Sequence, residues 1–318
     1  MSTSFVTPGG RIPAVQGVSL RVLSGQTVCI AGESGCGKSV TALSIMGLLP
    51  DNARVDGGRI LFRGNDLVTL SAEERRRLRG RGLAMVFQEP MTALNPVLTV
   101  GQQIAEVFLI HGTASAREAR ARALAMLSRV RIPDAERRYG EYPHQMSGGM
   151  KQRVMIAIAL AHKPALLIAD EPTTALDVTI QAQMLKLLRE LQREMGTGIV
   201  FVTHDLAVVA EIADEVVVMY AGRVVERAAA VDLFERPAHP YTLGLLNARP
   251  RIGQTRHNHG VLSVIPGRLP LPGERFEGCR YQARCPRVQA RCRAEEPPLQ
   301  AVNQGHEAAC FFPAGVAA

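Results

Sequence analysis

Residues Thr27 to Leu49 read TVCIAGESGCGKSVTALSIMGLL. The apolar stretch, the glycine-rich turn and the amphipathic stretch predict a strand, a loop and a helix, and this context argues against a chance glycine-rich loop. Glycines in such a loop let backbone N–H groups point inward, Lys38 adds a charge for β- and γ-phosphates, and the helix N-terminus adds its dipole. The G-x-x-x-x-G-K-S spacing therefore predicts a nucleotide site made of Gly32, Glu33, Ser34, Gly35, Cys36, Gly37, Lys38 and Ser39, with the Ser39 hydroxyl on Mg²⁺.

Composition sets the cellular context. The chain has 318 residues, 47% of them hydrophobic, and a net charge of +8 that is spread along the sequence. The opening MSTSFVTPGG lacks the regions of a signal peptide, and the most apolar tract is broken by His162, Lys163 and Pro164. We therefore expect a cytoplasmic protein without a nucleic-acid partner. In that reducing compartment, six cysteines favour metal ligation over disulfides.

A second apolar segment, ALLIAD at 165–170, has the pattern of a strand buried on both faces of a parallel sheet. It runs directly into the sequence DEP. Asp170 at the strand end could hold Mg²⁺ through water, and Glu171 is placed to polarise a hydrolytic water. An acidic pair at a strand end is more often merely solvated, but next to a phosphate loop the catalytic interpretation is favoured.

Four further motifs follow a fixed order with these two. They are FQEP with Gln88, MSGGMKQR with Ser147, Gly148 and Gly149, TTALD with Asp177, and FVTHD with His204. This order resembles the ATP-binding subunits of ABC transporters across about residues 12 to 227. The resemblance implies an α/β fold: a P-loop ABC ATPase core with an antiparallel β subdomain and a helical subdomain at about residues 90–160.

The resemblance also implies roles for the motif residues. In such ATPases two subunits face each other head to tail, so that Ser147, Gly148, Gly149 and Asp177 act on the ATP of the opposite subunit. Gln88 resembles the glutamine that contacts Mg²⁺ and water, and His204 would contact the γ-phosphate. Catalysis is thus predicted for Glu171, His204 and Gln88, with Mg²⁺ held through Ser39, Gln88 and Asp170. The aromatic residue that usually stacks on adenine is not evident, since Phe5 is the only aromatic before Gly32.

Local signals predict several helices. SAREARARALAMLSRV has a capping box in Ser115 and Glu118, followed by apolar residues at helical spacing. Ser71 and Glu74 form a similar box at the start of SAEERRRLR. TIQAQMLKLLRELQREMG predicts a long surface helix that stops at Gly196.

The end of the chain carries its own pattern. HPYTLGLL from His239 to Leu246, IPG from Ile265 to Gly267 and a GC…RC…C…C run resemble the C-terminal extension of ATPases from dipeptide, oligopeptide and nickel importers. This predicts an ABC ATPase domain over 1–235 and a small cysteine-containing extension over 236–318. The MSGGMKQRVMIAIAL and DEPTTALDVTIQAQ sequences resemble the first of the two ATPases that such importers use.

Four cysteines of the extension have an irregular spacing that decides nothing by itself. Related importer ATPases can carry a [4Fe–4S] cluster there, so the resemblance makes these cysteines candidate ligands. Structural zinc is the second alternative and unliganded thiols are the third. The four candidates are Cys279, Cys285, Cys292 and Cys310.

The predicted function is an ATP-hydrolysing subunit that energises peptide uptake at the cytoplasmic face of the inner membrane, as a peripheral protein. The resemblance implies a second, non-identical ABC ATPase, two transmembrane permease subunits and an extracytoplasmic solute-binding protein as partners. The alternatives are a nickel or glutathione importer, or a soluble ABC-type ATPase that is not coupled to transport.

Overall fold

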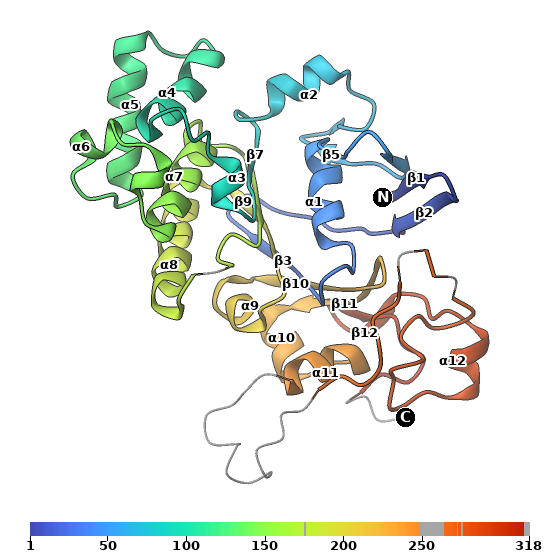
Figure 1. Ribbon diagram of the computed structural model, residues 1–318. Coiled ribbons are helices and arrows are strands. Elements are labelled where there is room, and N and C mark those ends of the chain that lie inside the picture. Colours follow the sequence, from blue (N-terminus) through green and yellow to red (C-terminus); the bar gives the residue numbers. More distant parts are fainter. Residues whose placement is uncertain (175, 249–263, 272, 275, 315–318) are drawn as a thin grey trace. The chain divides into compact units, whose positions relative to one another are not determined.

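The computed structural model describes residues 1–174, 176–248, 264–271, 273–274 and 276–314 (Figure 1). The chain divides into two compact units. The first contains Met1–Arg21, Val28–Val68 and Thr203–Ala318, and the second contains Val22–Thr27 and Thr69–Val202. The segment 249–263, which lies inside the predicted extension, is outside the described residues.

Two groups of strands build the first unit. One is an antiparallel sheet in the order β2-β1-β4, formed by β1 (Ser2–Thr7), β2 (Gly10–Val15) and β4 (Ala53–Gly57). The other runs in the order β12-β13-β11-β10-β3, with β3 parallel to β10 and the remaining pairs antiparallel. Its strands are β3 (Thr27–Ala31), β10 (Glu215–Tyr220), β11 (Arg223–Ala229), β12 (Gln300–Asn303) and β13 (His306–Ala308).

Short elements complete this unit. They are the β5 (Leu61–Phe62) and β6 (Asn65–Asp66) hairpin and the helices α1 (Lys38–Met46), α9 (Leu206–Ile212), α10 (Ala230–Glu235), α11 (Pro240–Asn247) and α12 (Ala290–Ala294). Strand β13, which belongs to the predicted extension, pairs with β11, which lies before residue 235. The extension therefore adds strands to a sheet of the ATPase domain. The boundary between 235 and 236 stays a prediction.

The second unit has a parallel group of strands in the order β9-β8-β7: β7 (Leu83–Val86), β8 (Leu166–Asp170) and β9 (Gly198–Thr203). Its helices are α2 (Ala72–Leu78), α3 (Pro90–Ala93), α4 (Val100–Ile110), α5 (Ala116–Arg129), α6 (Ala135–Tyr139), α7 (Gly148–Leu160) and α8 (Val178–Met195), with a 3₁₀ turn at Pro143–Gln145. Helices α4, α5 and α6 pack together (Figure 1).

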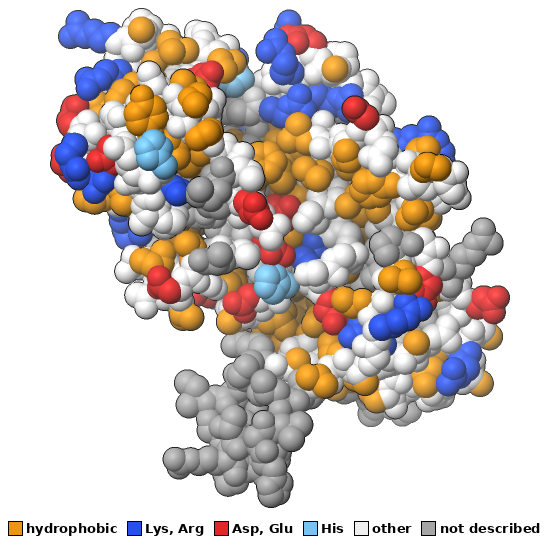
Figure 2. Space-filling view, viewed as in Figure 1, with side chains coloured by type: hydrophobic (Ala, Val, Ile, Leu, Met, Phe, Trp, Pro, Cys, Tyr) orange, Lys and Arg blue, Asp and Glu red, His pale blue; other side chains and the backbone are white. Residues whose placement is uncertain are grey.

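The predicted helix signals are confirmed. Ser115 and Glu118 form a reciprocal capping box at the start of α5, and Ser71 and Glu74 form one at the start of α2. Helix α8 ends at Gly196, whose φ of 66° is the left-handed conformation that glycine adopts at helix ends. Basic and acidic side chains are intermixed over the face shown in Figure 2, in keeping with the spread of charge along the sequence.

Candidate nucleotide site

The phosphate loop lies in the first unit, between the fully buried strand β3 and helix α1. Gly32 has a φ of 148°, and a Cβ there would lie 2.4 Å from the backbone oxygen of Met219. Only glycine therefore fits. The N-cap of α1 is Gly37, and no side chain caps the helix N-terminus. A helix start without a side-chain cap, preceded by a glycine-rich loop, is a suitable cradle for an anion.

Lys38 lies against this loop. Its side chain is 4% exposed, and its Nζ donates to the backbone oxygens of Gly32 (2.8 Å) and Glu33 (3.0 Å). The ammonium group is thus held inside the curve of the loop by the loop's own carbonyls. Cys36 is buried beside Gly32, and burial raises the pKa of its thiol, so this side chain is neutral packing.

His204 follows β9 and also belongs to the first unit. The turn that carries it is fixed on its C-terminal side: the Asp205 N–H donates to Thr203 Oγ1 (3.0 Å), and Asp205 Oδ1 accepts from the Ala207 N–H (2.7 Å) at the start of α9. The His204 side chain is exposed, as a group that meets a ligand must be.

The acidic strand end lies in the second unit. Asp170 and Glu171 are 6% and 9% exposed. Gln88 Nε2 donates to Glu171 Oε2 (3.2 Å), and Thr174 Oγ1 donates to the same oxygen (3.1 Å). Glu171 has a φ of 46°, a left-handed conformation that is costly for a residue other than glycine and that often marks functional sites. The structure therefore brings Gln88 and Glu171 together and fixes the carboxylate.

The two motifs predicted to act across a dimer also lie in the second unit. The Ser147 side chain accepts the Met150 N–H as the N-cap of α7, and Asp177 Oδ1 accepts the Ile180 N–H (2.9 Å) as the N-cap of α8. The helices approach so closely that a Cβ on Gly149 would lie 2.9 Å from Ile180 Cγ2. Close packing thus places the start of α7 next to the start of α8.

Sequence reasoning missed several residues around these motifs. Thr174 was missed although it follows Glu171 by three positions, a spacing at which a hydroxyl can reach back across a turn. Gln152 on α7 donates to the backbone oxygen of Pro172 and supports the same turn. Tyr241 and Arg284 contact the phosphate loop from the C-terminal part of the chain. Both lie in sequence patterns of the predicted extension, but nothing in those patterns indicated a contact with the loop.

Comparison with known proteins identifies the family to which this chain belongs. Residues 15–174 match the family described as ABC transporter, and residues 225–292 match the one described as oligopeptide/dipeptide transporter, C-terminal region. The chain belongs to the ABC transporter ATP-binding family.

Individual relatives agree. The probable peptide ABC transporter ATP-binding protein y4tR of Sinorhizobium fredii is 54% identical over 98% of this chain and 92% of its own length. The dipeptide transport ATP-binding protein DppD of Bacillus subtilis is 50% identical over the same shares of the two chains. A dimeric ATP-binding cassette solved in a post-hydrolysis state with ADP and Pi superposes with a TM-score of 0.65 at 30% identity, over 72% of this chain and 96% of its own. The predicted ABC ATPase fold class is confirmed.

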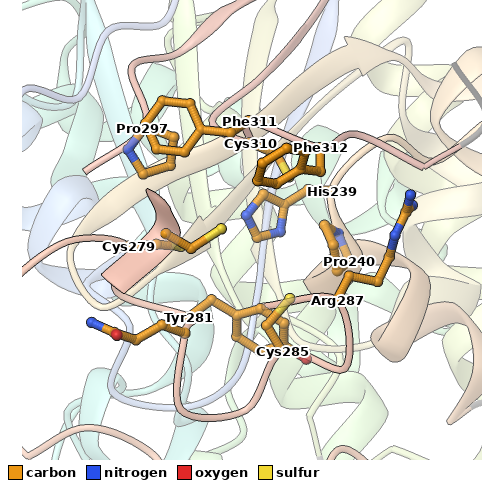
Figure 3. Close-up of a pocket in the computed structure, with 12 residues that line it drawn as sticks. His239, Pro240, Cys279, Tyr281, Cys285, Arg287, Pro297, Cys310, Phe311 and Phe312 are labelled. Atoms are coloured by element: carbon orange, nitrogen blue, oxygen red, sulfur yellow. The ribbon is translucent and has the colours of Figure 1, made fainter. Parts of the chain in front are cut away.

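The predicted [4Fe–4S] cluster of this ABC ATPase is wrong. In the part of the chain that the structure describes, no group of three or more His, Cys, Asp or Glu side chains is arranged to hold a metal ion, which also removes the zinc alternative. Cys279, Cys285, Cys292 and Cys310 are free thiols that line one pocket with the ring of His239 (Figure 3). This pocket encloses about 10 Å³, which is room for about one water molecule.

Burial explains the chemistry of that pocket. It raises the pKa of the Cys279 thiol to about 11 and also raises the pKa values of Cys285 and Cys310, so these thiols are neutral at pH 7. None of these four cysteines is joined in a disulfide. Within the described residues, no helix of this ABC ATPase combines the length and the apolar character needed to cross a membrane.

Proposed function

We propose that this chain hydrolyses ATP to energise peptide import through a membrane ABC importer. The observation that carries the proposal is the fixed carboxylate of Glu171, held by Gln88 and Thr174 at a strand end, in a chain that also has a complete phosphate loop. The peptide substrate is inferred from relatives that are named peptide and dipeptide transport ATP-binding proteins and cover almost all of this chain. Those names favour peptides over nickel as the transported substrate.

The residues divide the chemistry between them. Lys38 and the helix α1 N-terminus bind the phosphates and offset their charge. Glu171 orients the attacking water and accepts its proton, and His204 holds the γ-phosphate. Ser147, Gly148, Gly149 and Asp177 serve the nucleotide of a facing ATPase subunit. The hydroxyl, amide and carboxylate oxygens of Ser39, Gln88 and Asp170 are hard donors that suit Mg²⁺, which neutralises phosphate charge when bound.

The proposed setting follows from these roles. Because the relatives are named peptide and dipeptide transport ATP-binding proteins, we infer permease subunits that carry the peptide and a solute-binding protein that delivers it. We infer a second ATPase as the facing subunit, and a peripheral position at the cytoplasmic side of the permeases.

Glu171→Gln tests the catalytic assignment. The amide keeps the shape of the side chain but cannot take a proton, so turnover of the assembled importer should fall at least about 100-fold while ATP affinity changes less than about twofold. Steady-state hydrolysis and equilibrium binding measure the two effects, and Glu211→Gln on the exposed side of α9 is the matched control. Turnover within about twofold of wild type would contradict the assignment.

Transport by reconstituted vesicles tests the substrate. The importer assembled with its binding protein should accumulate a labelled tripeptide only with ATP inside the compartment that holds this subunit. Uptake of nickel without uptake of peptide would favour the alternative importer, and hydrolysis without any permease partner would favour an uncoupled ATPase.

A further inference from the structure

The cysteine-bearing segment also reaches the phosphate loop. Arg284, directly before Cys285, is 5% exposed. Its Nη1 donates to Glu33 Oε2 (2.7 Å) and its Nη2 donates to Glu33 Oε1 (3.0 Å). Glu33 is the second residue of the phosphate loop, and the two partners are 251 positions apart in the chain. A bidentate arginine–carboxylate pair is one of the strongest and most directional contacts available to side chains.

Contacts other than the one with Glu33 also hold the Arg284 side chain in place. Its Nε donates to the backbone oxygen of Pro266 (2.9 Å), and Nη2 also donates to that of Ile265 (3.5 Å). Gly267 leaves room for its stem, because a Cβ there would lie 3.1 Å from Arg284 Cγ. The IPG sequence therefore orients this guanidinium group through hydrogen bonds and close packing.

Tyr241 holds the backbone of the same loop residue. Its hydroxyl oxygen accepts the Glu33 N–H (2.9 Å), and its side chain is fully buried. The Tyr241 ring packs edge-on against Tyr220 (centroids 4.8 Å apart) and lies tilted against Tyr281 (5.3 Å). Both the side chain and the backbone of Glu33 are thus fixed by residues that follow position 235.

Glu33 connects these contacts to the phosphate-binding lysine. The backbone oxygen of Glu33 accepts a hydrogen bond from Lys38 Nζ, so a displacement of Glu33 displaces an acceptor of the ammonium group. A glycine-rich loop has many conformations, and holding it in one conformation removes part of the entropic cost of binding.

We propose that Arg284 is a positioning residue for ATP binding, which fixes Glu33 and through it the phosphate loop and Lys38 in the conformation that binds nucleotide. This rests on the proposed function of the loop as the ATP site. It makes the C-terminal segment part of the nucleotide site and gives the IPG and HPY sequences a common purpose. Arg284 acts on affinity, because it contacts the phosphate loop through Glu33, which is not among the groups assigned to the reacting water.

The test uses Arg284→Met, Glu33→Gln and the double variant of the full chain, each checked for cooperative unfolding. Arg268→Met is the control, since Arg268 pairs with Glu274 at the surface of the same segment (3.2 Å). Calorimetry with a β,γ-imido analogue of ATP should show a Kd raised about tenfold in each single variant, no further rise in the double variant, and no change in the control. In the assembled importer KM for ATP should rise about tenfold with kcat within about twofold, a split that partial unfolding would not produce.

The outcomes separate the two proposals. A folded Arg284→Met protein with wild-type affinity would overturn the positioning role, and so would losses that add in the double variant. If Arg284→Met does not fold, Glu33→Gln decides alone, and unchanged affinity there overturns the role. Failure of the wild-type chain to bind the analogue would instead overturn the ATP site itself.

Discussion

The phosphate loop and the cysteine pocket belong to the same compact unit, but they treat buried charge in opposite ways. In the loop, the Lys38 ammonium donates to two carbonyls and Glu33 pairs with Arg284. In the pocket, burial lowers the pKa of His239 to about 3 and raises that of Cys279 to about 11, so both side chains are neutral at pH 7.

This difference separates a ligand site from a packing site. A buried charge is expensive unless it is paired, so a protein that keeps one supplies partners and uses the charge on a ligand. The imidazole of His239 and the thiol of Cys279 are instead kept neutral by burial, as groups in a protein core are. Changes in the loop should therefore affect nucleotide binding before stability, and changes in the pocket segment should affect stability first.

Lys38→Ala should give the largest effect and tests the first half of the comparison. Loss of a charge aimed at phosphates should weaken ATP binding at least about 100-fold. The free energy of unfolding should change by less than about 1 kcal/mol, because removing the buried ammonium group also removes its desolvation cost, which offsets the loss of its hydrogen bonds to the backbone oxygens of Gly32 and Glu33. Calorimetry and urea unfolding measure the two quantities, with Lys186→Ala on the exposed face of α8 as control. If Lys38→Ala mainly lowers the free energy of unfolding and changes ATP affinity little, the loop is not a ligand site in contrast to the pocket.

The sequence predicted the features whose causes are local. The phosphate loop, the capping boxes of Ser71 and Ser115 and the end of α8 at Gly196 each follow from a few neighbouring residues that set backbone conformation. Strand β13 could not be predicted from its own three residues, because it exists by pairing with the edge of β11. The pair of Arg284 and Glu33 joins residues 251 positions apart, for which no local signal exists.

The prediction of a metal cluster at the four cysteines was wrong for a different reason. Their number and the family resemblance suggested a metal, but a ligand set also requires side chains that converge at bonding distances and lose their protons. Here the backbone already closes the segment: the Cys279 N–H donates to the backbone oxygen of Cys292 (2.8 Å). The turn is held by main-chain geometry, so its integrity can be tested through glycine.

Gly278→Ala should give the second-largest effect. Gly278 has a φ of 80°, and a Cβ there would lie 2.4 Å from the backbone oxygen of Cys292 and 2.6 Å from that of Arg293. We expect the free energy of unfolding to fall by about 3 kcal/mol. Gly305→Ala is the matched control: its φ is 72° but nothing lies within 4 Å of the added Cβ, so only about 1 kcal/mol should be lost. Equal losses in urea unfolding would mean that this close approach does not stabilise the segment.

His239 gives the smallest predicted effect and tests the neutral character of the pocket. It is 2% exposed, and its Nδ1 accepts the Tyr241 N–H (3.0 Å) as the N-cap of α11. Burial is the main cause of its lowered pKa, and a backbone hydrogen bond at Ala309 partly opposes it. The Glu226 carboxylate accepts the backbone N–H of His239 (2.9 Å) and is paired with His306.

The sign of the pH effect follows from this. The folded pKa of about 3 lies below the ordinary value of 6.5, so between these values the unfolded chain binds one more proton and stability falls as the pH falls. His239→Asn keeps a capping oxygen but cannot titrate. The stability advantage of wild type over this variant should therefore shrink by about 2 kcal/mol from about pH 7 to about pH 5, in urea unfolding at both values. His144→Asn, at an exposed histidine, is the matched control. A constant difference between wild type and His239→Asn would show that the imidazole is solvated at low pH, and the pocket would then tolerate charge as the phosphate loop does.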